Sequence, residues 1–442
     1  MMNKLLIALI CGGAPLAAPL FAEDSPAPAP SLSLAQVIDQ VLSRHPSLDA
    51  AQAAVDAARA RTEQGNAGRL PQVSVSGSYT FMTPRPYVSF SLPSGSSQFY
   101  ETSQNSYTTA LGLRQLLTDF GHTDAVVALA RAGEISARDA LDQVRSQLGY
   151  QAIQAFYGVL LLRESIGVAD EEIRALEESG RISAQKFSSG SVTKLDVLTT
   201  GVRLANARNR RTDTVAALQK QEALLRELLS DAPGASLPLA GEFEDGGQSP
   251  DLSSVIAEAL QNRPEMKLAH DDEATSERRI DAADRVDRPV VAAQASGGVE
   301  DGTLPDLYDN RGYVAANVGV SVPLFTGHRS EGLQVEARAD LRAAQARERE
   351  LAATITTDVE DALTDLAAAR SRLRNADALV SQANEALSLA RSRYANGVIT
   401  DFELLDAQSS ARGAELTRLQ ARYDCTLARQ ALARATGRPP AP

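Results

Sequence analysis

Residues 34–46 read LAQVIDQVLSRHP, and residues 252–264 read LSSVIAEALQNRP. The two stretches carry leucine, valine, isoleucine, leucine and proline at matching places, each 218 positions apart. The same offset of 218 separates Pro71 from Pro289. A pattern of apolar and proline positions that returns at a constant distance indicates an internal repeat, and this repeat decides the fold.

A second set of matches extends the repeat toward the C-terminus. Segments 187–198 and 394–405 share an aromatic residue, a glycine, a threonine, an acid and a leucine at an offset of 207. The difference of 11 residues between the two offsets indicates a longer loop in the first copy. The sequence therefore predicts a first repeat over residues 32–230, a linker over 231–249 and a second repeat over 250–437.

The N-terminus has the pattern of an exported protein. Lys4 precedes an apolar run and then small residues, which predicts a signal peptide over residues 1–22. Cys11 lies inside this segment, and the bulky Ile10 before it disfavours attachment of a lipid there. Residues 23–31 (EDSPAPAPS) predict an extended Pro/Ala linker between the signal and the first repeat.

The composition excludes several classes of protein. A formal net charge of −12 argues against nucleic acid and anionic membrane surfaces as partners. Only Cys425 remains after the signal is removed, so no internal disulfide is expected and stability must come from packing or assembly. The mature sequence shows no apolar run of about 18 residues, so no transmembrane helix is expected and any membrane span must be a β-barrel.

Two long stretches of the chain, residues 94–232 and 324–438, contain no proline and are rich in alanine, leucine, arginine and glutamate. Such stretches permit uninterrupted helices. We expect helical hairpins over residues 121–231 and 327–436, each with one helix of about 100 Å, too long for a compact globule. Shorter helices of about 35 Å before each strand pair would then fill the part of the long helix that the return helix leaves uncovered.

The segments that follow Pro71 and Pro289 have a different period. Valine, tyrosine and phenylalanine alternate with serine, threonine, asparagine and glutamine, which is typical of strands with one apolar and one polar face. The predicted strands are residues 71–83, 106–118, 289–299 and 312–325. The loops between them, residues 84–105 and 299–311, are expected on the outside of the cell.

The apolar faces of these strands need a partner. Ordinary hairpins on a soluble core are one possibility, but the neighbouring segments are long amphipathic helices, and a sheet that exposed valines to water would aggregate. Facing lipid removes this problem. Four strands are too few for a transmembrane barrel, which needs about eight, so several chains must share one barrel. Three chains would supply twelve strands and four chains sixteen, with the polar faces lining a water-filled pore.

The joints between strands and helices, and the tips of the hairpins, carry a resemblance. The joints read LTDFGH at residues 117–122 and PLFTGH at 323–328, and the tips read FSSGSVT at 187–193 and YANGVIT at 394–400. In these motifs and in the duplicated frame, the chain resembles the TolC-type outer-membrane efflux channel family over nearly all of its mature length.

The resemblance implies the fold class, the location and the partners. It implies an α+β membrane protein whose homotrimer forms a twelve-strand β-barrel in the outer membrane, continued by an α-helical barrel of coiled-coil helices through the periplasm. It also implies a passive exit duct of a tripartite efflux pump or type I secretion system. The implied partners are outer-membrane lipid, a periplasmic adaptor (membrane fusion) protein and an inner-membrane transporter, and cargo remains open.

The hairpin tips are the candidate interaction sites. A glycine lets the backbone reverse between the helices, and a threonine hydroxyl can cap the returning helix. The resemblance implies that the exposed tips contact the adaptor, and these tip residues are Gly190, Ser191, Val192, Thr193, Gly397, Val398, Ile399 and Thr400.

Three acids near the tips are the candidate gate. Glu403 and Asp406 lie three positions apart, which places both carboxylates on one helix face. The resemblance implies that they form acidic rings at the periplasmic entrance and favour cations, and that Asp196 helps to hold the entrance shut. The chain departs from the family pattern at Ile399, where a basic residue can tie the gate closed, so the bonds that close this channel are an open question.

The chain shows no catalytic pattern. His45, His122, His270 and His328 are scattered, none has a metal-ligand spacing with cysteine or carboxylate, and there is no phosphate-binding glycine loop. We therefore expect no enzyme, no cofactor and no metal site. The alternative to a channel is a periplasmic coiled-coil structural or adhesion protein without a pore, which would not need strands with one valine-rich face.

Overall fold

A computed structural model describes residues 31–439 apart from 236, 244–249, 305–306 and 308. The helices are α1 (Leu34–Arg44), α2 (Pro46–Ala67), α3 (His122–Ser188), α4 (Lys194–Leu229), α5 (Leu252–Asn262), α6 (Pro264–Ala283), α7 (Arg329–Ala395) and α8 (Asp401–Ala435). The strands are β1 (Gln72–Phe81), β2 (Tyr87–Leu92), β3 (Gly95–Tyr100), β4 (Thr102–Thr118), β5 (Val290–Thr303) and β6 (Arg311–Ser321). The expected signal peptide, with Cys11, lies outside the described residues.

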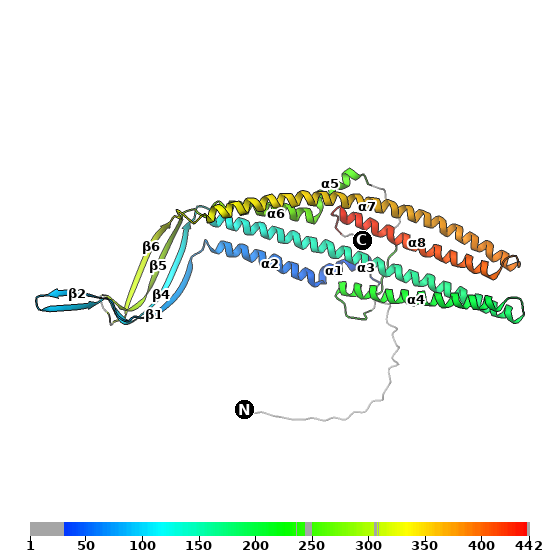
Figure 1. The fold of residues 1–442 in the computed structure, drawn as a ribbon, viewed down its shortest axis with the longest axis horizontal. Coiled ribbons are helices and arrows are strands. Elements are labelled where there is room, and N and C mark those ends of the chain that lie inside the picture. The colour runs from blue at the N-terminus through cyan, green and yellow to red at the C-terminus, as the bar shows by residue number, and fades with distance from the viewer. Residues whose placement is uncertain (1–30, 236, 244–249, 305–306, 308, 440–442) are drawn as a thin grey trace, which may run out of the picture.

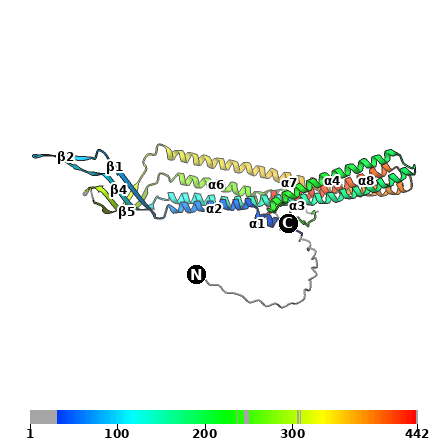
Figure 2. The ribbon, with the colours of Figure 1, turned by 90° about the horizontal axis from the view of Figure 1, so that it is seen from below.

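The molecule is elongated, with the sheet at one end and the tips of two helical hairpins at the other (Figures 1 and 2). Helices α3 and α7 contain 67 residues each, which corresponds to about 100 Å. Each pairs with a shorter return helix, α4 or α8, at the end away from the sheet. Toward the sheet α2 packs against α3, and α6 packs against both α3 and α7, so that α6 joins the two repeats.

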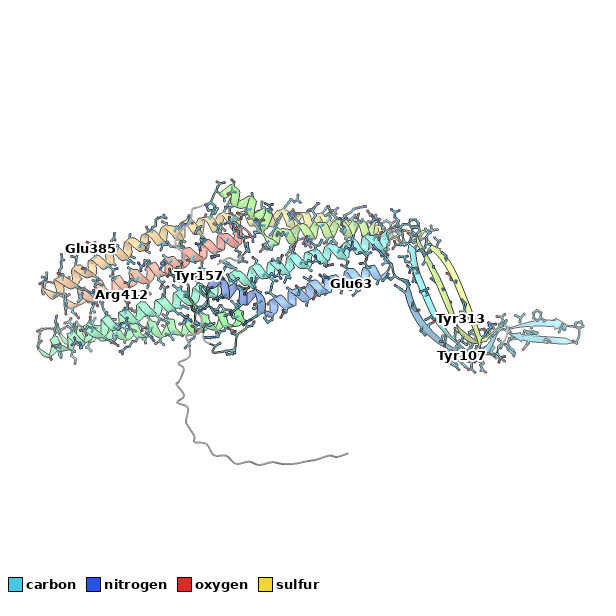
Figure 3. All side chains as sticks on the ribbon, turned by 180° about the vertical axis from the view of Figure 1, so that it is seen from behind. Glu63, Tyr107, Tyr157, Tyr313, Glu385 and Arg412 are labelled. Atoms are coloured by element: carbon cyan, nitrogen blue, oxygen red, sulfur yellow. The ribbon has the colours of Figure 1, made fainter. Side chains whose placement is uncertain are left out.

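The largest buried side chains of α3 lie where its neighbouring helix changes from α4 to α1 and α2. Ile153, Phe156 and Tyr157 of α3 pack against α1 and the end of α4, and Figure 3 places Tyr157 near the middle of the helical part. Phe243, from the expected linker over 231–249, stacks on Tyr157 with 5.9 Å between ring centroids. This part of the linker therefore belongs to the core.

Helix α3 corrects one expectation from the sequence. We expected no apolar run of about 18 residues after the signal. One 18-residue window of α3 has a mean hydropathy of 1.3, and 44% of that window is buried inside the protein. Core helices of water-exposed domains have such composition, and α3 supplies the side chains at the centre of the largest apolar cluster.

Four antiparallel strands form one sheet in the order β1-β4-β5-β6. The register aligns Val75 with Leu111 and Gly297 with Val314, so apolar side chains of all four strands share one face. Val314 on this face is 88% exposed. The opposite face carries serine, threonine, asparagine and glutamine, and the edge strands β1 and β6 have no partner on their outer sides among the described residues.

The segment between the first two predicted strands differs from its expectation. We expected a loop over residues 84–105, yet β2 and β3 form a second, two-stranded sheet there, which projects beyond the main sheet (Figure 1). The reason lies in Tyr87–Leu92, where YVSFSL alternates with a period of two although proline, serine and glycine surround it. In the second repeat β5 extends to Thr303 and β6 begins at Arg311, so the connecting loop is shorter than expected. Strand β6 ends at Ser321, before the predicted end at residue 325.

Candidate functional site

The first hairpin tip is a tight reversal closed by a capping box. Gly190 has a φ of 72°, a left-handed conformation that favours glycine. The backbone N–H of Thr193 donates to Asp196 Oδ2 at 2.8 Å, and the Asp196 N–H donates to the Thr193 hydroxyl at 3.3 Å. Hydrogen bonds from the side chain and backbone of Thr193 hold the pKa of Asp196 below its ordinary value. The Asp196 carboxylate is thus bound within its own tip.

The second tip repeats this geometry. Gly397 has a φ of 70°, and Thr400 caps α8. The backbone N–H of Thr400 donates to Glu403 Oε2 at 2.8 Å, and its hydroxyl donates to the same atom at 2.9 Å. These bonds lower the pKa of Glu403 below its ordinary value. Asp196 and Glu403 therefore occupy the same position of one repeated motif, the third residue of a capped helix.

The sequence analysis missed three interactions that join the two hairpins. Ser183 of α3 donates its hydroxyl to Asp401 Oδ2 of α8 at 3.0 Å. Lys186 Nζ donates to the Tyr394 hydroxyl at 2.7 Å and lies 4.1 Å from the centroid of that ring. Tyr394 is visible in the sequence as a repeated aromatic position. Ser183 and Lys186 carry no such signal, because their partners lie in the other repeat.

A third link lies farther from the tips. Arg412 of α8 donates to Glu171 of α3 at 2.8 Å and to Glu415 on its own helix at 2.6 Å. Figure 3 shows Arg412 between the two hairpins. Charge-assisted bonds of this kind are stronger than neutral ones, and the Arg412 side chain is 20% exposed. This link therefore holds the two hairpins together at a position far from their tips.

Asp406 lies apart from the capping boxes. It lines a cavity of about 180 Å³ between the two hairpins, together with Glu172, Arg203, Arg391, Leu405 and Arg412. Arginines, acids and leucines line it, and helices α3, α4, α7 and α8 all contribute. Of the three predicted gate acids, Asp406 is the one located between the hairpins.

One side-chain group in the described part of the chain has metal-ligand proximity. His270 and Glu273 of α6 and Glu348 of α7 offer ligand atoms within 4.8 Å of one another. His270 Nδ1 lies 3.2 Å from Glu348, and a hydrogen bond with Glu273 raises the pKa of Glu348. The sequence did not reveal this group because Glu348 belongs to another helix. The contact between His270 and Glu348 links α6 to α7.

Comparison with known proteins decides the family. The model of the outer membrane efflux protein family matches residues 37–230 and 255–438, one segment for each repeat. The chain belongs to the outer membrane efflux protein family. The two matched segments follow the duplication closely.

Curated relatives of this efflux protein are distant but extend over most of its length. Outer membrane protein OprJ of Pseudomonas aeruginosa is 26% identical over 401 residues, 86% of this chain and 78% of OprJ. The alkaline protease secretion protein AprF of the same organism is 26% identical, over 87% of this chain and 80% of AprF. The outer membrane efflux protein BepC of Brucella suis is 24% identical, over 75% of this chain and 72% of BepC.

Solved structures share the fold. The outer membrane protein VceC of Vibrio cholerae superposes with a TM-score of 0.75 at 20% identity, over 92% of this chain and 96% of VceC. The CmeC outer membrane channel of Campylobacter jejuni gives 0.76 at 17% identity, over 91% of this chain and 85% of CmeC. The predicted fold class, a duplicated α+β membrane protein whose trimer forms a β-barrel and an α-helical barrel, is therefore confirmed.

Function and location follow from the family. The chain is an outer-membrane channel of the kind that serves efflux and secretion, with a large periplasmic helical part. The family consists of channel proteins. The alternative of a coiled-coil protein without a pore has no support, because the relatives are channels and the sheet has an apolar outer face.

Proposed function

We propose that three copies of this chain form the exit duct of a tripartite efflux pump or type I secretion system. The sheet that supplies the barrel wall and the hairpins that reach away from it support this proposal (Figure 1). The tips, Gly190 to Thr193 and Gly397 to Thr400, contact a periplasmic adaptor, which connects the duct to an inner-membrane transporter. Val398 is 70% exposed, an apolar side chain at the tip available for such a contact.

The adaptor contact is tested by crosslinking in cells. A photoreactive amino acid at Ser191 or Val398 should form an adduct with the periplasmic adaptor. The same probe at Ser253, exposed on α5 and distant from the tips, is the control. Adducts from Ser253 as abundant as those from the tips would contradict a tip contact.

The periplasmic gate, in this proposal, is closed by the bonds between the two hairpins. Lys186 supplies from the first hairpin the basic group that Ile399 lacks, and its bond to Tyr394 holds the second hairpin. The bonds Ser183–Asp401 and Glu171–Arg412 add to this closure. Opening then requires the hairpins to move apart as rigid bodies, driven by the adaptor.

Single-channel recording in a planar bilayer tests the gate. Lys186→Met removes the charge and the donor while it keeps most of the side-chain length, so mean conductance should rise above that of the wild type. Lys220→Met, an exposed lysine in the C-terminal third of α4 and far from the tip, serves as the matched control. A Lys186→Met channel that conducts like the wild type and the control would reject Lys186 as part of the closure.

A further inference from the structure

The β2–β3 hairpin has one apolar face and one polar face. Val88 pairs with Phe99, Phe90 with Ser97 and Leu92 with Gly95, so three apolar side chains of β2 share a face with Phe99. Phe90 and Phe99 are 54% and 66% exposed, and their rings contact edge to face at 6.3 Å. The opposite face carries serines, Gln98 and a pair of tyrosines.

The hairpin lacks the charges that protect exposed strands. Residues 86–100 contain no aspartate, glutamate, lysine or arginine, in a chain with 23% charged residues. Natural sheets place charged side chains on exposed strands to prevent association, and an isolated two-stranded hairpin is only marginally stable in water. Its apolar face therefore needs a cover, which the exposure of Phe90 and Phe99 shows that its own chain does not provide.

The place where the hairpin joins the main sheet indicates what packs against its apolar face. β2 follows β1, and β1 is an edge strand of the four-stranded sheet. In the trimer that this fold forms, β1 must pair with β6 of a neighbouring copy to close the barrel. Each hairpin connects β1 to β4, which pair within one chain, so it lies beside the seam with the neighbouring copy. Figure 2 shows the hairpin of one copy at the end of the sheet away from the helices, so the three hairpins of a trimer surround one axis at that end.

The hairpin is long enough to meet its copies. Strands of six residues, at about 3.3 Å per residue, extend about 20 Å beyond the rim. A twelve-strand barrel with strands about 4.8 Å apart and tilted about 40° has a radius of about 12 Å. Hairpins that lean inward therefore reach the barrel axis.

We propose that the three β2–β3 hairpins pack their apolar faces against one another and form a collar over the outer mouth of the pore. The contact consists of Val88, Phe90, Leu92 and Phe99 of each copy. The tyrosine face, where Arg85 lies 3.9 Å from the centroid of the Tyr100 ring, remains in contact with water. The collar narrows the extracellular end, and cargo must separate the hairpins to leave.

Cysteine crosslinking tests the collar with neighbouring residues of one strand. Phe90→Cys places a thiol on the apolar face, and Ser89→Cys places one on the polar face. The trimer, in native outer membranes, is treated with a short bis-maleimide. Crosslinked dimers should be several-fold more abundant for Phe90→Cys than for Ser89→Cys. The wild-type chain, whose Cys425 is buried, measures the background.

Each other outcome overturns the proposal. Equal crosslinking from both faces means proximity without face-specific packing, and no crosslinking from Phe90→Cys in a protein that light scattering shows to be a trimer means that the hairpins do not meet. A fluorophore on Phe90→Cys that brominated phospholipids quench means that lipid covers the face. A monomer in light scattering would contradict the trimer itself, which is a separate result.

Discussion

Asp271 of α6 makes the stability of the folded chain depend on pH. Burial, together with the neighbouring Asp139 carboxyl, raises the pKa of Asp271 to about 6. Because this pKa lies above the ordinary value of 3.8, the folded chain holds the proton more tightly than the unfolded chain. The contribution of this group to stability is fully present below pH 3.8 and is lost as the pH rises through 6.

Asp271→Asn should remove the loss of stability that occurs as the pH rises through 6. The amide resembles the protonated acid, so the melting temperature in detergent should rise by a few degrees at pH 7.5 and remain unchanged at pH 3.5. The control is Asp284→Asn, an exposed residue 3.7 Å from Arg338. An equal shift at both pH values would show that the pKa of Asp271 is not the cause.

The caps of the tips make a second prediction for single residues. A threonine cap contributes about 1 kcal/mol, so Thr400→Ala should speed amide hydrogen exchange in the first turn of α8 about fivefold. Thr417→Ala is the control, because the Thr417 hydroxyl donates to the Gly413 carbonyl inside the same helix and caps no helix end. Unchanged exchange in the first turn after Thr400→Ala would mean that the capping box does not hold the tip.

The sequence predicts the residues of the tips better than their roles. Glycine and threonine at fixed places identify the reversals and the caps, because these residues act within a few positions of the chain. Asp196 and Glu403 complete the same capping motif, three positions after each threonine, although the sequence analysis assigned them to the gate alone. Lys186 and Ser183 could not be found, because their bonds depend on how the two repeats lie against each other.

Among the elements, the sheet follows most directly from the sequence. Alternation with a period of two separates the faces, and the register of the strands depends on the same alternation, since a shift of one residue would turn valines inward. The β2–β3 hairpin was missed because its strands are short and its flanks resemble a loop. The length of α3 and α7 was readable because proline is missing over each of them.

The two faces of β6 should respond differently to charge. Val318 lies on the apolar face and is 65% exposed, whereas its neighbour Asn317 lies on the polar face. An arginine that faces lipid near the bilayer centre costs about 2–4 kcal/mol, so Val318→Arg should weaken folding into lipid vesicles in urea titrations. Asn317→Arg should fold like the wild type. Equal effects of both changes would contradict the assignment of the faces.

For the whole molecule, the residues of one chain leave the number of copies open. Four strands with free edges at β1 and β6 require other copies, since unpaired strand edges do not occur in lipid. Twelve strands from three copies and sixteen strands from four copies would both close a barrel. The choice of three copies came from the family resemblance, and the fold that the chain shares with solved outer-membrane channels supports it as part of the proposed function. In the proposed function the pump selects the cargo, so the residues of the channel do not identify the cargo.

The charge of the periplasmic entrance is a property of the assembled channel. In the proposed trimer, Glu403 at the tips and Asp406 between the hairpins would supply six carboxylates to the periplasmic entrance. Replacing both residues by alanine should reduce cation selectivity, measured as the reversal potential under a salt gradient. Glu385→Ala, an exposed acid on α7 that Figure 3 shows on the outer side of its hairpin, is the control. Reversal potentials that stay at the wild-type value in the double variant would reject the acidic rings.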